Sequence, residues 1–314
     1  MYRSTHALIK TEKKLKRSIN GILLLDKPKG WSSNKALQEV KSLFNAKKAG
    51  HTGSLDPLAT GLLPICFGEA TKFSQFLLEA NKAYRVQALL GSKTTTGDAE
   101  GEIIQTRPVD PAWLEQLEVI LPHFRGTISQ LPPMYSALKF NGKPLYTLAR
   151  QGITIERPTR EVTIHTLKLL DSTATTLDLE IQCSKGTYIR TLIEDIGEAL
   201  GCGAYVQMLR RIGVDSYGQS EMLNFETLQT LSEEARDQSL RPLDSLLPLW
   251  PTIRLSQAAA YYLCRGQAIL LPETPKSGWV RLVSTVTNQF IGIGEMLADG
   301  RVAPRRLLEL RHLA

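Results

Sequence analysis

Hydrophobic and polar positions follow two different periods along this chain, and the alternation between them predicts an α+β protein. Residues 21–26 form a continuous apolar run, typical of a buried strand, and residues 62–67 form a second short apolar run. In residues 82–90 the buried-type positions Tyr84, Val86 and Ala88 alternate with others, which predicts a sheet strand. Two further strand patterns occupy residues 161–170 and 176–183.

Helical spacing of apolar residues marks four other segments. The first spans about residues 33–44, and Ser33 is predicted to cap it. The second starts near Glu69, and the third covers residues 111–121. The fourth, residues 189–200, is a clear amphipathic helix that Gly201 is expected to end.

The pattern divides the chain into three parts. Residues 1–20 are polar and basic with little periodicity, which predicts a mobile tail. Residues 21–250 form one large α/β domain, interrupted at about 124–152 by a stretch of prolines, aromatics and basic residues that we interpret as an exposed insertion. Residues 251–314 follow a cluster of prolines and show a short helix and three strand patterns, which predicts a small β-rich domain.

Composition indicates a soluble protein with an anionic partner. The 314 residues are 42% hydrophobic and 22% charged, and the formal net charge is +7. Nucleic acid is the leading partner class and an acidic membrane surface the weaker one. No apolar run approaches the roughly 20 residues that span a bilayer, and basic residues interrupt the start of the chain where a signal peptide would be apolar. We therefore expect no membrane association and a cytoplasmic location.

Cysteine and histidine usage gives no sign of a metal or disulfide framework. The four cysteines and five histidines are scattered, without C-x-x-C or mixed ligand spacing. No glycine-rich dinucleotide or P-loop motif occurs either. No cofactor is expected.

The most informative segment is residues 50–61, GHTGSLDPLATG. Glycines and a proline favour a tight, rigid turn, and such a turn can project a polar side chain into a cleft at a fixed angle. Asp56 precedes Pro57 and is therefore biased away from helical backbone. Most Asp-Pro aspartates serve only as turn residues. The second turn carboxylate, Asp98, is the rival to Asp56 as a nucleophile, while Glu194 and Asp195 are most simply the solvated face of a helix.

Residues 50–61 resemble the catalytic signature of the TruB-type tRNA pseudouridine synthases, and every fixed position of that signature is filled. The resemblance extends to further segments in the family's order: residues 21–30, 82–86, 130–139, 186–192 and 209–211. Pieces of residues 292–306 resemble, more weakly, the family's C-terminal PUA-like domain.

The resemblance implies a set of site residues. Asp56 would be the nucleophile, attacking either the sugar C1′ or the uracil ring. Arg190 would be its counter-ion, since a bidentate guanidinium favours the ionised carboxylate. Tyr84 would stack on the target base, and its hydroxyl would help to remove the C5 proton. Tyr188 and Leu209 match substrate-contact positions. His51 would fill the space left by a flipped-out uridine, and Lys27 would support the catalytic loop or touch phosphate.

The resemblance also implies a fold and an activity. The expected fold is α+β, a mixed and largely antiparallel sheet in the catalytic domain followed by a small C-terminal β-barrel-like domain. The expected activity is isomerisation of the T-loop uridine, position 55, to pseudouridine by a monomer acting on the tRNA T-stem-loop without guide RNA or cofactor. A guide-dependent ribosomal-RNA synthase, an RNA chaperone or binding protein, and a basic protein that binds any polyanion remain as alternatives.

Overall fold

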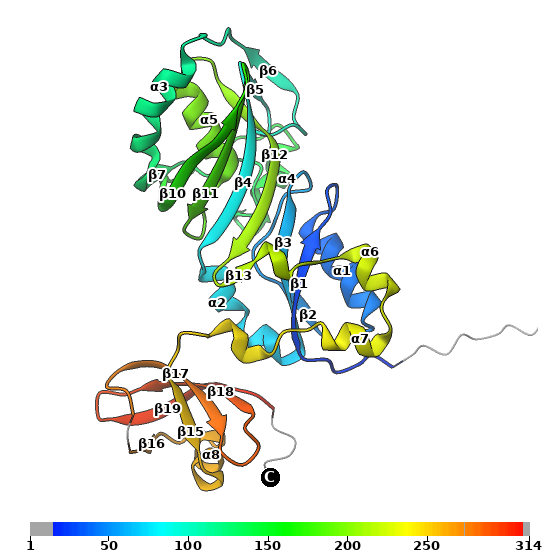
Figure 1. Ribbon diagram of the computed structural model, residues 1–314, viewed down its shortest axis with the longest axis vertical. Coiled ribbons are helices and arrows are strands. Elements are labelled where there is room, and N and C mark those ends of the chain that lie inside the picture. Colours follow the sequence, from blue (N-terminus) through cyan, green and yellow to red (C-terminus); the bar gives the residue numbers. More distant parts are fainter. Residues whose placement is uncertain (1–14, 273, 310–314) are drawn as a thin grey trace, which may run out of the picture.

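Two β-sheets organise the computed structural model, which describes residues 15–272 and 274–309 (Figure 1). Ten of the strands in this part of the chain form one large sheet, in the order β14-β1-β3-β12-β4-β11-β10-β7, with β2 paired to β3 and β13 to β12. These strands are β1 (Gly21–Lys27), β2 (Ala49–His51), β3 (Thr60–Phe67), β4 (Lys82–Leu90), β7 (Gly126–Gln130), β10 (Arg160–Ser172), β11 (Thr176–Cys183), β12 (Ala204–Val214), β13 (Tyr217–Gly218) and β14 (Leu223–Asn224).

The large sheet is mainly antiparallel, as expected, but its two halves meet in a parallel pair. Strand β3 joins β12 through the pairs Thr60–Arg210 and Gly61–Arg211. Only glycine fits at position 61, because its φ is +97° and a Cβ there would lie 2.2 Å from the carbonyl oxygen of Arg211. The close approach of these two backbones is thus built into the sequence.

Helices pack on both faces of the large sheet, and each face has its own apolar cluster. The helices of the chain's first part are α1 (Ser33–Leu43), η1 (Gly68–Phe73), α2 (Ser74–Glu79), α3 (Trp113–Ile120), η2 (Leu121–Phe124) and α4 (Leu145–Ala149). They are followed by α5 (Ile189–Ala199), η3 (Gln219–Glu221), α6 (Phe225–Thr230), α7 (Glu233–Gln238) and η4 (Leu243–Leu246). Apolar side chains of α1, α3 and α5 share one core with the sheet. The four helical segments expected from periodicity are all present.

The N-cap of α1 differs from the prediction by one residue. Ser32 makes the cap, accepting a hydrogen bond from the backbone N–H of Lys35 at 3.1 Å. Ser33 is instead the first helical residue, and its hydroxyl lies buried against the backbone of Leu55. Two adjacent serines are equally good caps on sequence grounds, and the long-range contact selects between them.

Strand β4 shows the predicted alternation and places one edge of the site. Tyr84, Val86 and Ala88 are buried on the face that shares its core with α1, α3 and α5, whereas Arg85 is exposed on the other. The register with β12 sets Tyr84 directly opposite Arg211, and the register with β11 sets it opposite Ile181. Strand β4 therefore presents Tyr84 from the middle of the sheet.

The C-terminal part of the described chain is a smaller five-stranded sheet with one helix. Its strands are β15 (Thr252–Leu255), β16 (Ile269–Leu270), β17 (Gly278–Ser284), β18 (Phe290–Met296) and β19 (Arg301–Leu307), with helix α8 (Gln257–Cys264). The helix and three of the strands were predicted, while the short β15 and β16 were not. Aromatic packing connects this sheet to the rest. Trp250 packs against Phe76 and Trp279, with ring centroids 5.1 and 5.6 Å away, and Phe76 and Trp279 lie 6.1 Å apart.

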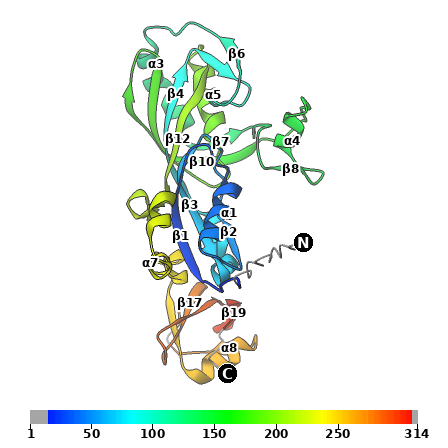
Figure 2. The same ribbon diagram turned by 90° about the vertical axis from the view of Figure 1, so that its right-hand side faces the viewer.

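The insertion and the tail complete the description. The expected insertion begins with β7, which belongs to the large sheet. The rest of it holds one short hairpin, β8 (Lys139–Phe140) paired with β9 (Lys143–Pro144), before α4, and Figure 2 shows this part standing away from the sheet. The remaining hairpin, β5 (Ser92–Thr94) with β6 (Ile103–Thr106), follows β4. Residues 1–14 of the predicted tail lie outside the described residues, and its end is held where Arg17 pairs with Glu233 and Asp237. Among the described helices, none has the length and apolar character needed to cross a membrane.

Candidate active site

The segment between β2 and β3 carries Asp56 on a loop that is pinned from several sides. The buried hydroxyl of Ser33 contacts both backbone groups of Leu55, at 2.7 and 3.0 Å. The carbonyl of Pro57 accepts from the N–H of Gly30 at 2.8 Å, and the N–H of Thr52 donates to Pro64 at 3.1 Å. Asp56 thus projects from a rigid support, as the turn residues of this segment predict.

Arg190, in the first turn of α5, pairs with Asp56 as the resemblance implied. Its Nε lies 3.0 Å from Oδ2 of Asp56. Its two terminal nitrogens donate to the carbonyls of Thr96, at 2.9 Å, and Tyr135, at 2.7 Å. The guanidinium is 5% exposed at the residue level and ties together the Asp56 loop, the turn after β5 and the insertion. All three segments must therefore be in place for Arg190 to hold this position.

Asp98 faces the same nitrogen of Arg190 as Asp56 does. Its Oδ2 lies 3.8 Å from Nε of Arg190, and its Oδ1 accepts from the hydroxyl of Thr96 and the N–H of Glu100. Sequence reasoning treated Asp98 only as a rival to Asp56. The structure instead buries Asp98 beside Arg190, so two carboxylates, those of Asp56 and Asp98, form ion pairs with one arginine.

The electrostatics of Asp56 are a balance of opposed effects. Burial raises the pKa of Asp56 above its ordinary value, and the negative charge of Asp98 raises it further. The adjacent Arg190 and, more weakly, Lys27 lower it. The Asp56 side chain is still 42% exposed because it opens onto a cavity. Ionisation of Asp56 therefore depends on Arg190.

A cavity of about 350 Å³ opens above this pair. It is lined by five of the seven residues singled out from the sequence: Asp56, Tyr84, Tyr188, Arg190 and Leu209. Residues 136–138 of the insertion form part of its wall. The cavity has a volume within the range of small-ligand sites and combines one carboxylate–guanidinium pair with an aromatic floor.

Tyr84 and Tyr188 are held in different ways. Tyr84 is 9% exposed, and burial raises its pKa while the guanidinium of Arg211 lowers it. Tyr188 is fixed through its backbone, whose N–H and carbonyl bond both ends of the Gln130 amide, at 2.8 and 3.0 Å. Both rings are therefore presented to the cavity from anchored backbone.

Lys27 and His51 do not line this cavity. Lys27 is fully buried, and its Nζ donates to the carbonyls of Pro28 and Trp31, at 2.9 and 2.6 Å. Burial lowers its pKa to about 8. His51 lies at the end of β2 opposite Ile65, half-buried, and its Nδ1 has no hydrogen-bond partner among the described residues. Lys27 thus braces the segment before α1, whereas His51 retains an unused ring nitrogen.

Two lining residues that sequence reasoning missed are Lys82 and Arg211. Lys82 Nζ donates to three carbonyls, those of Leu77, Leu78 and Ala80, at 3.1, 2.7 and 2.6 Å. Burial lowers its pKa to about 8. A signal for them existed, because both lie within the family-like segments 82–86 and 209–211.

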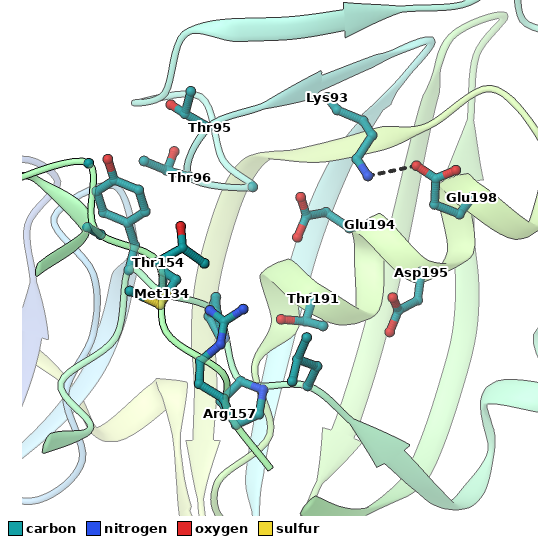
Figure 3. A pocket seen from close by; sticks show the side chains of 17 residues that line it. Lys93, Thr95, Thr96, Met134, Thr154, Arg157, Thr191, Glu194, Asp195 and Glu198 are labelled. Atoms are coloured by element: carbon teal, nitrogen blue, oxygen red, sulfur yellow. Dashed lines mark ion pairs between the residues drawn. The ribbon is translucent and has the colours of Figure 1, made fainter. Parts of the chain in front are cut away.

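A second cavity, of about 480 Å³, is lined by residues of α5, of the turn after β5 and of the insertion (Figure 3). Thr191, Glu194 and Asp195 of α5 face it, together with Lys93, which pairs with Glu198 at 2.7 Å. Glu194 and Asp195 are half-buried here rather than fully solvated as expected, and burial raises the pKa of both. Thr96 and Tyr135, whose carbonyls hold Arg190, also line this cavity.

Comparison with protein families identifies the chain. A model described as "TruB family pseudouridylate synthase (N terminal domain)" matches residues 41–189. Models described as "tRNA pseudouridylate synthase B C-terminal domain" and "Pseudouridine synthase II TruB, C-terminal" match residues 190–248 and 251–308. A tRNA pseudouridine synthase B of Coxiella burnetii is 55% identical over 95% of this chain and 98% of its own length. The chain belongs to the TruB family of pseudouridine synthases.

Further relatives agree with this assignment. A tRNA pseudouridine synthase B of Pseudomonas aeruginosa is 55% identical over 94% of this chain and 98% of its own length. Two solved structures share the fold: one titled as an H/ACA RNP bound to a substrate RNA containing 2′-deoxyuridine, the other as the archaeal box H/ACA sRNP Nop10-Cbf5 complex. The first covers 93% of this chain and 86% of its own at 20% identity, the second 96% and 90% at 21%, and both have a TM-score of 0.69. The expected α+β fold of this TruB-family enzyme is confirmed.

Proposed function

We propose that this chain converts the T-loop uridine of tRNA, position 55, to pseudouridine, with Asp56 as the nucleophile. Membership of the TruB family makes it a pseudouridine synthase, and the relatives' names supply tRNA as the substrate class. The observation that supports the proposed mechanism best is the pair formed by Asp56 and Arg190 at the floor of a cavity that Tyr84 also lines.

The proposed chemistry starts from the ionised Asp56. Pseudouridylation breaks the bond between N1 of the uracil and C1′ of the ribose, turns the base, and joins C5 to C1′. Burial raises the pKa of a carboxylate, and a charge-assisted hydrogen bond opposes this and keeps the group ionised. The ionised carboxylate can then attack either C1′ or the uracil ring. Arg190 supplies the hydrogen bond and fixes the direction of attack. The reaction is redox-neutral, so no cofactor is required.

The loosened base needs walls that keep it near C1′. Tyr84 would stack on it, while Tyr188 and Leu209 would limit its movement to rotation within the cavity. The hydroxyl of Tyr84, a residue that lines the cavity, would help to remove the C5 proton once the new bond has formed. These three residues act in the proposal as the binding surface for the detached uracil.

Access of the uridine requires that it leave the stacked T loop. His51 would occupy the space left by the flipped base, and a flip of this kind costs a few kcal/mol. The insertion at residues 124–152 and the small sheet domain at residues 251–314 would bind the RNA around it. The net charge of +7 favours phosphate contacts that weaken as salt rises. The chain would act as a monomer and without guide RNA, in the cytoplasm.

Release of tritium from [5-³H]uridine-labelled tRNA transcripts tests this proposal. Wild type and Asp56→Asn would be compared with Asp171→Asn, a matched change at an exposed strand position away from the cavity. We expect release by wild type and the Asp171 variant, from position 55 alone, and none by the Asp56 variant. Binding of naked tRNA by wild type without release would refute the proposal and favour a guide-dependent or purely RNA-binding protein.

A further inference from the structure

Arg211 is a fully buried arginine that has no acidic partner. It is 1% exposed, and it forms no ion pair with Asp or Glu among the described residues. Its neighbour Arg210 differs, because its Nη1 and Nη2 donate to Oδ1 and Oδ2 of Asp26, at 2.9 and 2.7 Å. An unpaired buried charge is costly for folding, so a purely structural role would be better filled by an apolar residue of similar volume.

Arg211 contacts the Asp56 loop and strand β3. Its Nε donates to the carbonyl of Leu62 at 2.6 Å and its Nη2 to the carbonyl of Gly53 at 3.2 Å. The β4–β12 register places it directly opposite Tyr84 on the same face of the sheet. Arg211 and Tyr84 both line the cavity that holds Asp56. One guanidinium thus links the Asp56 loop, strand β3 and the tyrosine.

We propose that Arg211 is a positioning residue for the isomerisation, holding the Gly53 carbonyl of the Asp56 loop and the Tyr84 ring in fixed relation and supplying positive charge to the cavity floor. This inference rests on the function proposed above. It assigns to Arg211 a role distinct from that of Arg190, which contacts the carboxylate itself.

The chemistry explains why an unpaired cation belongs there. Once the glycosidic bond is broken, the detached uracil carries negative charge until C5 bonds to C1′. A fixed positive charge in a site shielded from water stabilises such charge more strongly than it would in solution. An acidic partner for Arg211 would cancel this effect. The same charge lowers the pKa of the Tyr84 hydroxyl against the effect of burial, which eases proton transfer at that group.

Lys82 adds to the positive character of this corner without competing for the role. It lines the same cavity, but its Nζ is occupied by three backbone carbonyls. Both side chains approach Gly53, because a Cβ built there would lie 3.5 Å from Nη1 of Arg211 and 3.9 Å from Cε of Lys82. Arg211 is therefore the cation of this pair that is directed at the loop and the tyrosine.

Single-turnover pseudouridine formation at saturating T-stem-loop RNA tests the inference, with the dissociation constant measured alongside. The variants are Arg211→Met, Arg211→Lys, Tyr84→Phe and the double variant Tyr84→Phe/Arg211→Met. Arg85→Met is the matched control, because Arg85 precedes Val86 on β4 and faces the opposite side of the sheet. Cooperative urea unfolding identifies any variant that does not fold.

We expect Arg211→Met to slow the saturated rate about 100-fold or more, in line with the loss of one preorganised donor, while RNA affinity changes less than threefold. Arg211→Lys should recover part of the rate, and Arg85→Met should match wild type. The double variant should be slower than Tyr84→Phe alone, but by less than the product of the two single effects, because part of the role of Arg211 passes through Tyr84. A wild-type rate for Arg211→Met, or a loss confined to affinity, would overturn the inference. If Arg211→Met does not fold, the rate of Arg211→Lys decides: a rate equal to wild type refutes the positional role, since the lysine cannot bond both sites.

The two proposals fail in different ways. Absence of pseudouridine with wild type refutes the proposed function, whatever the variants do. If wild type is active, Asp56→Asn is inactive and Arg211→Met keeps the full rate, only the role of Arg211 is refuted and the proposed function stands.

Discussion

The Nε of Arg190 lies 3.0 Å from Oδ2 of Asp56, and this contact joins the first turn of α5 to the loop that precedes β3. The pair brings together two segments more than 130 residues apart in the sequence. It also sets the ionisation of the carboxylate, since burial and Asp98 act in the opposite direction. The pH dependence of the reaction should therefore report on this contact.

Replacement of Arg190 should move the acid side of the pH–rate profile upward. In the proposed mechanism the reaction needs ionised Asp56, so kcat/KM falls as pH drops through the raised pKa of this group. Arg190→Gln removes the main influence that lowers that pKa, and burial and Asp98 remain. The acid limb should shift to higher pH, and kcat should fall at every pH because the direction of the carboxylate is lost. Measurement of kcat/KM from pH 5 to 8 for wild type and Arg190→Gln tests this. An acid limb at the same pH in both proteins would contradict the assignment of Arg190 as the group that keeps Asp56 ionised.

Asp98→Asn should move the same limb the other way. The change removes a negative charge that raises the pKa of Asp56 and keeps a side chain of similar shape. The acid limb should then lie at lower pH than in wild type, with a smaller loss of kcat than Arg190→Gln causes. The same pH series measures it. A shift in the same direction for both variants would show that Asp98 acts mainly by holding Arg190.

Gly61→Ala should destabilise the protein strongly. A Cβ at this position would lie 2.2 Å from the carbonyl oxygen of Arg211, and φ is +97°. Strained backbone and an overpacked contact together should cost about 3 kcal/mol or more. Gly142→Ala is the control, because φ is +81° there but nothing lies within 4 Å of a built Cβ, so about 1–2 kcal/mol is expected. Urea unfolding measures both; equal losses would contradict the close approach of β3 and β12.

Lys82 should make stability rise with pH in the alkaline range. Burial lowers its pKa from 10.5 to about 8, so between these values the unfolded chain binds a proton that the folded protein has released. Stability increases with pH wherever the unfolded state binds more protons. The free energy of unfolding of wild type should therefore increase, relative to that of Lys82→Met, from pH 8 to 10. Relative to Lys168→Met, changed at an exposed position, it should show no such increase. A constant difference would mean that Lys82 is not buried as described.

Much of this site could be predicted from the sequence because it rests on local pattern. The turn residues around Asp56, the alternation that buries Tyr84 and the amphipathic spacing of α5 are all local features, and they place three site residues on rigid elements. Asp98 could not be assigned in this way, because its importance lies in sharing Arg190 with Asp56 across a gap of 92 positions. A turn carboxylate looks the same in sequence whether or not a guanidinium faces it.

Strand β12 shows the same limit for the fold. Its segment was matched only as Leu209-Arg210-Arg211, and its mixture of polar and charged residues hides a central strand. The choice between Ser32 and Ser33 as the cap of α1 was decided by Leu55, 22 residues beyond Ser33. Pattern indicates which face of an element is buried. It does not indicate which distant backbone group the buried polar atom meets.

The parallel pairing of β3 with β12 has a mechanical consequence. The backbone pairing that joins the two halves of the large sheet consists of two register pairs, and the side chains of Arg210 and Arg211 bond across the same junction. Asp56 belongs to the half that contains β1 and β3, whereas Tyr84, Arg190 and Leu209 belong to the half built around β4 and β12. A shear or bend along this junction changes the spacing between Asp56 and those three residues while each half keeps its own geometry. The stiffness of this short junction therefore limits how much the distance between Asp56 and the other three residues can vary.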